Sequence, residues 1–128
     1  MRKLASRIYL LTAILIGLGA FGHGSRASHL ADLLAKSPAI EPPLAAVLIA
    51  VWYFVSGCML VFAAIAIHTW LRARRGERGI YFASDAIGAF YAIVGAATVA
   101  YTRQPFFLVF LVLGILLIAS SWVMRRTE

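Results

Sequence analysis

Four long apolar runs, separated by short polar stretches, constrain this chain more than any other feature of its sequence. The runs cover residues 8–24, 44–70, 80–101 and 106–123. Each can cross a bilayer, because a hydrocarbon core about 30 Å thick takes roughly 20 helical residues that rise about 1.5 Å each. Hydrophobic residues fill 62% of the 128 positions and charged residues only 13%, unlike a soluble domain. The sequence therefore predicts an all-α integral membrane protein, a four-transmembrane-helix bundle forming one domain over residues 1–128.

The basic residues lie between the apolar runs and predict how the bundle is oriented. Nine Lys and Arg residues fall at the two termini and in the loop 71–79, against three on the other side. Because basic loops stay on the cytoplasmic side, we expect both termini to be cytoplasmic, in a bacterial-type cytoplasmic (inner) membrane. The net charge is +7, but the basic residues lie between apolar runs and form no basic face on a soluble fold. Nucleic acid is therefore not an expected partner.

The first apolar run also has the features of a secretory signal peptide. A basic start, an apolar stretch and Ser25-Arg26-Ala27 together resemble a cleavable signal. We favour retention as a transmembrane helix, because Ala13, Gly17 and Ala20 form a small-residue face that suits helix packing. A discarded signal would not need that face.

The first outer loop carries a short helical pattern over residues 28–37. Ser28 stands at the N-cap position, three leucines share one face, and Asp32 precedes Lys36 by four residues. Pro38 ends the pattern, and two further prolines at 42 and 43 suit the first turn of the second span. We expect an amphipathic helix on the outer membrane surface, with a plain soluble loop as the alternative. The short basic inner loop could contact anionic lipid headgroups, although topology alone would also require it.

Small residues recur every four positions along the third span. Close approach of helix backbones over small side chains drives much of the packing in lipid, so this row is predicted to face protein. Its partner is either the first span, through Ala13 and Gly17, or a second copy of the chain. The row consists of Ser84, Gly88, Ala92, Ala96 and Ala100.

Asp85, beside this row, is the one carboxylate inside an apolar run. It lies roughly 8 Å from the inner boundary of the span, and a carboxylate at mid-membrane costs about 2.5–3.5 kcal/mol on insertion scales, so a partner is expected. Folding the second span back on the third would bring His68 within a helical turn, and Arg72, Arg7 or Arg125 could reach it from the inner surface. One interpretation is a proton or cation site with His68, since histidine titrates near neutral pH. The other is a static Asp–His or Asp–Arg clamp between helices.

The three histidines and the single cysteine give no strong chemical signal. His23 and His29 are predicted on the outer side and His68 on the inner side, so no pair shares the depth needed to hold a haem. His23 and His29 with Asp32 could hold a surface metal weakly, but no metal or other cofactor is predicted. Cys58 lies within the second span and packs as a small hydrophobe. The sequence has no HExxH, GxSxG or P-loop pattern, which favours a non-enzymatic role.

Three classes of function fit these features. The leading one is a non-catalytic accessory, assembly or scaffold subunit that associates, as a homo-oligomer or in a larger membrane complex, through small-residue helix faces. The second is a small carrier, or a lipid- or quinone-handling protein, that uses Asp85 and His68. The third is a membrane enzyme acting on quinone or lipid through Trp52, Tyr53 and Phe54. Membrane lipids are the other expected contacts.

Two segments carry a family resemblance, SRIYLLTAILIGLGAFGHG in the first span and WYFVSGCML in the second. Their order, with an outer amphipathic loop between them and two more spans to follow, resembles DoxX-like membrane proteins. His23 and Phe54 stand where that family usually has a lysine and an acidic residue. The resemblance implies a small four-helix inner-membrane protein, often an accessory to a redox or stress-response complex.

Overall fold

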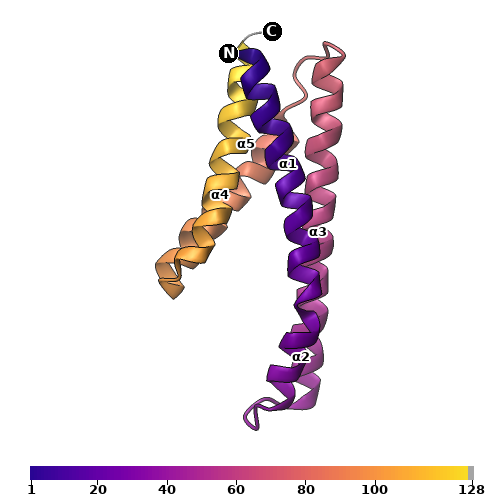
Figure 1. Cartoon of the computed structure of the whole chain (residues 1–128), viewed down its shortest axis with the longest axis vertical. Coiled ribbons are helices and arrows are strands. Elements are labelled where there is room, and N and C mark those ends of the chain that lie inside the picture. The colour runs from indigo at the N-terminus through magenta and orange to yellow at the C-terminus, as the bar shows by residue number, and fades with distance from the viewer. Residues whose placement is uncertain (127–128) are drawn as a thin grey trace.

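The computed structural model describes residues 1–126, and all regular structure within them is helical (Figure 1). The elements are α1 (Arg2–Ser25), α2 (Ala27–Ala35), α3 (Pro42–Arg74), α4 (Phe82–Thr102), the 3-10 helix η1 (Pro105–Phe107) and α5 (Leu108–Arg126). Four segments are long and apolar enough to cross a membrane: Arg2–Ala35, Pro42–Arg74, Phe82–Thr102 and Pro105–Arg126. The all-α class and the number of candidate spans are thus confirmed.

The helices form two packed pairs that diverge. α1 lies along α3 and α4 lies along α5, while α5 also packs on α1. Figure 1 shows both termini and the α3–α4 loop at one end, where the pairs meet. We call this the terminal end and the opposite end the far end. Away from the terminal end, the α4–α5 pair swings away from α3.

The ends of α3 and α4 follow from local sequence. Glu41 is extended, and Pro42 and Pro43 occupy the first turn of α3, where the missing N–H groups cost nothing. At the other end of α3, Gly76 has a φ of +81°, which a glycine adopts without strain. α4 ends at Arg103, whose left-handed conformation directs its N–H back to the Val99 carbonyl.

The outer helix forms at Ala27–Ala35, close to the expected residues 28–37, but its N-cap and its packing differ from the expectation. α2 follows α1 with only Arg26 between them, in a near-helical conformation, so Ser28 lies inside the helix and is not its cap. α2 then packs along the first part of α3 and so continues the line of α1, where we had expected a helix lying flat on the membrane (Figure 1). The reason is that Leu34 buries itself against α3, which offers a protein surface to the apolar face of α2.

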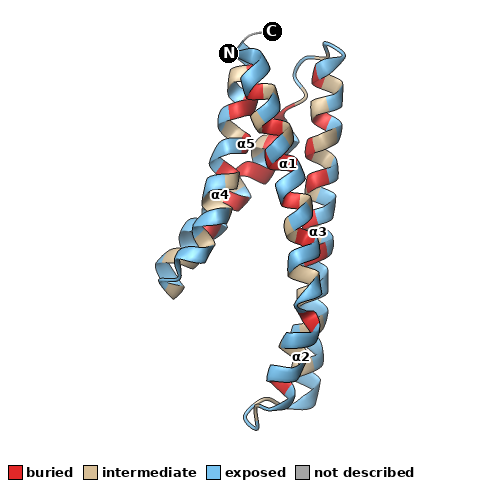
Figure 2. Cartoon of the chain, in the orientation of Figure 1, coloured by how far each residue is buried: buried red, intermediate tan, exposed pale blue. Residues whose placement is uncertain are grey.

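The core lies where the two pairs converge. Figure 2 shows most buried residues on the inward sides of the helices toward the terminal end. Tyr9, Ala13 and Ile16 of α1 and Leu117 of α5 are wholly buried there. Many large apolar side chains outside this core are exposed, as expected of helices that face lipid.

Candidate functional site

Asp85 is bound by α5 at the terminal end. The Ser121 hydroxyl donates a hydrogen bond to Oδ1, and the Arg125 guanidinium donates one to Oδ2 and forms an ion pair. Arg125 also lies over the Tyr81 ring, 5.5 Å from its centroid. Arg125 is one of the basic residues that the sequence suggested, and the geometry is that of an Asp–Arg clamp between α4 and α5.

The other suggested partners of Asp85 lie elsewhere. His68 is exposed on α3, because α3 packs against α1 and makes few contacts with α4. Arg72 instead pairs with Glu77 in the α3–α4 loop, with Nε and Oε2 2.6 Å apart. Arg7 is exposed on α1. Within residues 1–126 no hydrogen bond or ion pair joins Asp85 to His68, and the site that would use both residues stays a prediction.

A second polar contact joins α1 to α4 next to the clamp. The hydroxyl groups of Tyr9 and Ser84 share a hydrogen bond, and both side chains are fully buried. Ser84 directly precedes Asp85, so the same turn of α4 is bonded to α1 through Ser84 and to α5 through Asp85. Tyr9 was not predictable from the sequence, because an isolated tyrosine in an apolar run belongs to no functional pattern.

The small-residue row of α4 packs against α5 within the chain. A Cβ on Gly88 would lie 2.7 Å from Ile118 Cγ1 and 3.0 Å from the Gly114 carbonyl oxygen, so the backbones are in close contact. The row faces protein at Ser84 and Gly88 but not at Ala96 and Ala100, which are exposed. A four-residue repeat advances about 40° per step around a helix of 3.6 residues per turn, so four steps move about 160° off the packed face.

Further along the two helices, where the row no longer faces α5, Gly95 of α4 and Gly114 of α5 keep the backbones in close contact. A Cβ on Gly95 would come within 3.0 Å of Leu111 Cα, and one on Gly114 within 2.5 Å of the Ala92 backbone nitrogen. On α1, Gly17 faces Ala63 of α3. A Cβ added to Gly17 would lie 3.3 Å from the Cβ of Ala63. Each small face thus has a partner within the chain, α5 for α4 and α3 for α1.

His23 links α1 to α3 further along. Its ring stacks on Trp52, with centroids 3.9 Å apart, and its Nδ1 lies 2.9 Å from the Ser56 hydroxyl oxygen. The Trp52 indole N–H also donates to the His23 carbonyl. Tyr53, Phe54 and His29 are exposed. Within residues 1–126, no three His, Cys, Asp or Glu side chains gather closely enough to hold a metal ion.

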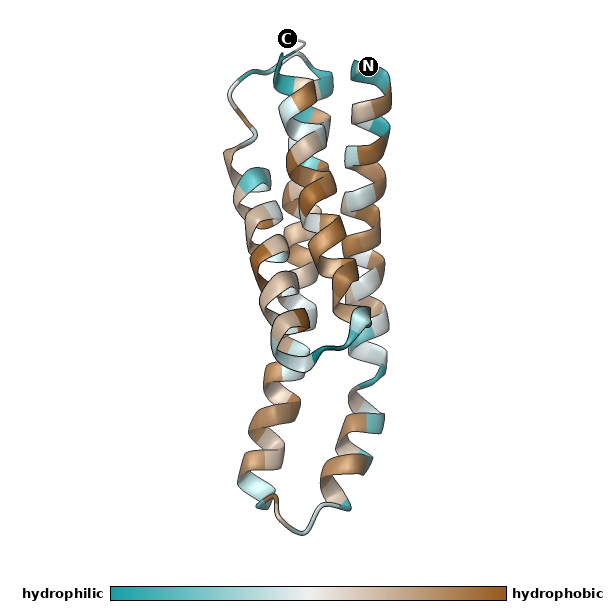
Figure 3. Cartoon of the chain, turned by 90° about the vertical axis from the view of Figure 1, so that its left-hand side faces the viewer, coloured by the Kyte–Doolittle hydropathy of each residue, from teal (hydrophilic) through white to brown (hydrophobic). Residues whose placement is uncertain are grey.

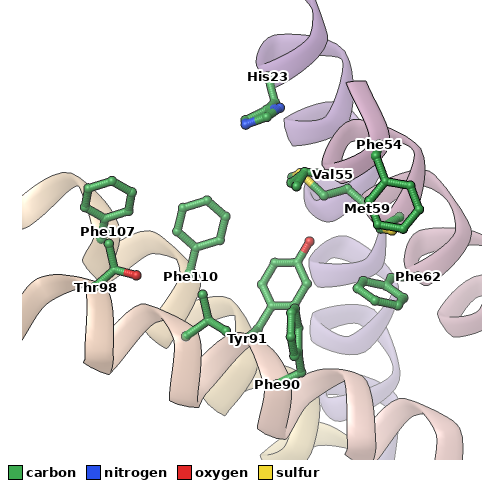
Figure 4. Close-up of a pocket in the computed structure, with 12 residues that line it drawn as sticks. His23, Phe54, Val55, Met59, Phe62, Phe90, Tyr91, Thr98, Phe107 and Phe110 are labelled. Carbon is green, nitrogen blue, oxygen red and sulfur yellow. The ribbon is translucent and has the colours of Figure 1, made fainter. Parts of the chain in front are cut away.

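A cavity of about 370 Å³ separates the two helix pairs (Figure 4). Five phenylalanines and Tyr91 dominate its wall, with Cys58 and Met59 from α3 and His23 at one side. Tyr91 is 3% exposed, and its hydroxyl has no hydrogen-bond partner within the described residues. This cavity was not predictable from the sequence, because its lining comes from α1, α3, α4, η1 and α5 and forms only where the two helix pairs diverge.

Comparison of the chain with protein-family models, curated proteins and solved structures gives no match. The class of the protein therefore follows from the fold alone. By the length and composition of its four candidate spans, it is a small, all-helical, multi-pass membrane protein.

Proposed function

We propose that the chain is a non-catalytic accessory or assembly subunit of a cytoplasmic (inner) membrane that associates with a second copy of itself. In this proposal both termini are cytoplasmic, because nine of the twelve Lys and Arg residues lie at the terminal end. The resemblance of the first two spans to DoxX-like proteins implies the same kind of role.

The observation that carries the proposal is an apolar projection at the far end. α3 has 33 residues, about 50 Å, whereas α4 has 21, about 32 Å. The apolar part of α3, residues 44–70, spans about 40 Å and would need a tilt above about 40°, just beyond the usual range of about 0–40°, to fit within a core about 30 Å thick. We infer that the far end of α3 extends past the hydrocarbon, because Arg72 and Arg74 place its other end at the opposite interface. We call α2 together with residues 42–53 of α3 the far hairpin.

The far hairpin exposes a continuous apolar surface. Leu33, Leu44, Val47 and Val51 are each more than half exposed. Figure 3 shows hydrophobic residues along both arms of this hairpin down to the polar loop that joins them. An apolar groove of about 550 Å³ also lies between its two helices, next to the prolines of the loop. Exposed apolar surface outside the bilayer core marks an interaction site.

Charge on the far hairpin favours a second copy as the partner. Asp32 of α2 and Lys36, which directly follows this helix, lie about one helical turn apart, and both are exposed. In a two-fold arrangement, residue i of one copy contacts residue j of the other and j contacts i, so Asp32 of each copy can pair with Lys36 of the other, one helical turn away. The apolar side chains would be covered by the same contact.

For the alternative of a carrier that uses Asp85 and His68, residues 1–126 show no hydrogen bond or ion pair between the two side chains. Asp85 is held by Ser121 and Arg125, and His68 is exposed on α3. The aromatic group Trp52, Tyr53 and Phe54 likewise forms no catalytic cluster, because Trp52 is occupied by His23 and the other two are exposed. We therefore assign Asp85 a structural role.

Native mass spectrometry of the chain, released from lipid nanodiscs, tests the proposal. We expect the mass of two chains for the wild type and of one chain for the double variant Leu33→Asn, Val47→Asn. The control is Leu4→Asn, an exposed leucine at the terminal end, which should remain a dimer. A monomeric wild type, or dimers unaffected by the double variant, would contradict the proposal.

A further inference from the structure

We propose that the cavity between α3 and the α4–α5 pair binds a membrane quinone. A quinone is a planar ring that bears both carbonyl oxygens and an apolar tail. This proposal is independent of self-association through the far hairpin, because it concerns a different surface. It rests on a buried hydroxyl, the depth of that hydroxyl, and the shape and lining of the cavity.

The hydroxyl of Tyr91 is the polar group that needs a ligand. Its side chain is 3% exposed, and the oxygen finds no hydrogen-bond partner in the part of the chain described. Figure 4 shows this hydroxyl directed away from α4 into the space between α4 and α3. Buried hydroxyl groups in proteins are almost always hydrogen-bonded, so an acceptor from outside the chain is expected here. A purely apolar occupant would leave it unpaired.

The depth of Tyr91 in the membrane limits which molecules can supply that hydrogen-bond acceptor. Tyr91 lies nine residues after Phe82, about 14 Å along α4, which is near the middle of a core about 30 Å thick. The ester oxygens of phospholipids lie at the interface, about 15 Å away, so their acyl chains would bring only methylene groups to this point. The acceptor must belong to a molecule that carries its oxygen into the apolar core.

The cavity wall favours a flat ring. Phe62 and Phe90 meet edge to face with centroids 5.8 Å apart, and Tyr91 and Phe110 lie 5.8 Å apart. Aromatic side chains attract other rings in edge-on and offset-stacked geometries. The volume of about 370 Å³ is more than twice that of a cavity of about 150 Å³ known to hold benzene. It therefore has room for one ring and the first part of a tail.

The test uses a short-tailed ubiquinone analogue and, as a matched probe, an alkylbenzene of similar length without carbonyl groups. Both are titrated into the protein in nanodiscs, and binding of each is followed by quenching of tryptophan fluorescence or by native mass. We expect Tyr91→Phe to weaken quinone binding about tenfold, since only the hydrogen bond is lost, and to leave alkylbenzene binding unchanged. Tyr101→Phe, at a tyrosine of the same helix that is 90% exposed, should change neither.

A second variant checks the location of the site. Val94 lines the cavity, so Val94→Trp should fill it and abolish binding of both probes while circular dichroism still reports a helical protein. Three results would each overturn the proposal: no quinone binding by the wild type, equal quinone affinity in the wild type and Tyr91→Phe, or full binding by Val94→Trp.

Discussion

Arg125, near the end of α5, binds the carboxylate of Asp85 on α4, 40 residues earlier in the chain. This pair is the one ionic link between two apolar helices at the terminal end among residues 1–126. It explains why an acid persists in an otherwise apolar span. The carboxylate has a cation and a hydroxyl as partners, and it is shallow enough for the arginine to reach it.

The clamp predicts that Asp85 and Arg125 are energetically coupled. Arg125→Leu should lower the free energy of unfolding by roughly 1 kcal/mol, because the Asp85 carboxylate loses its counter-charge. The effect is modest because both side chains of the native pair are partly exposed. The same change should cost much less in an Asp85→Asn background, where the amide still accepts from Ser121. A double-mutant cycle in a detergent unfolding titration measures the coupling. The control is Arg126→Leu, since Arg126 lies over Trp122 and not at Asp85; strictly additive effects would contradict the clamp.

The close packing of α4 on α5 predicts that two glycines cannot be enlarged. Gly95→Ala and Gly114→Ala should each destabilise the protein by about 1–3 kcal/mol, because the added methyl group meets backbone that cannot yield. Gly57→Ala is the matched control: a Cβ added there would meet no atom within 4 Å beyond its own turn of helix, so the change should be neutral or slightly stabilising. Thermal unfolding in one detergent compares the three. Equal effects at all three positions would show that α4 and α5 are not in backbone contact.

The buried contact between Tyr9 and Ser84 predicts a smaller effect that is specific to the hydroxyl. Tyr9→Phe should cost about 1 kcal/mol, because it leaves the buried Ser84 hydroxyl without this partner. The double change Tyr9→Phe, Ser84→Ala should recover part of that loss, since both polar groups are then removed. Unfolding titrations of the two variants give the difference. A Tyr9→Phe variant as stable as the wild type would mean that the contact contributes nothing.

The spans were predictable from the sequence because the thickness of the bilayer sets how many apolar residues a helix needs to cross it. The pairing of the helices was not. Chain order suggested that α3 folds back on α4, but the side chains that decide pairing are Gly17 with Ala63 and Gly88 with Gly114. Those contacts join helices that are not consecutive, α1 with α3, as well as neighbours, α4 with α5. Small residues mark a packed face without naming its partner.

The candidate site divides in the same way. Asp85 was identifiable because a carboxylate in an apolar run needs a partner, and Arg125 was among the cations in reach. The sequence could not decide between His68 and Arg125, because the choice depends on which helices pack together. Tyr91 was not identifiable at all, since a tyrosine in an apolar span is ordinary until its hydroxyl is seen to lack a partner.

Cysteine cross-linking in native membranes tests the central claim, association through the far hairpin, most directly. In a Cys58→Ala background, single cysteines are placed at Leu33, Val47 and Val51, each exposed on that hairpin, and at Leu4 at the terminal end. Mild oxidation should give covalent dimers at one or more of the three hairpin positions and none at Leu4. Dimers at Leu4 with a monomeric chain at all three hairpin positions would contradict the account.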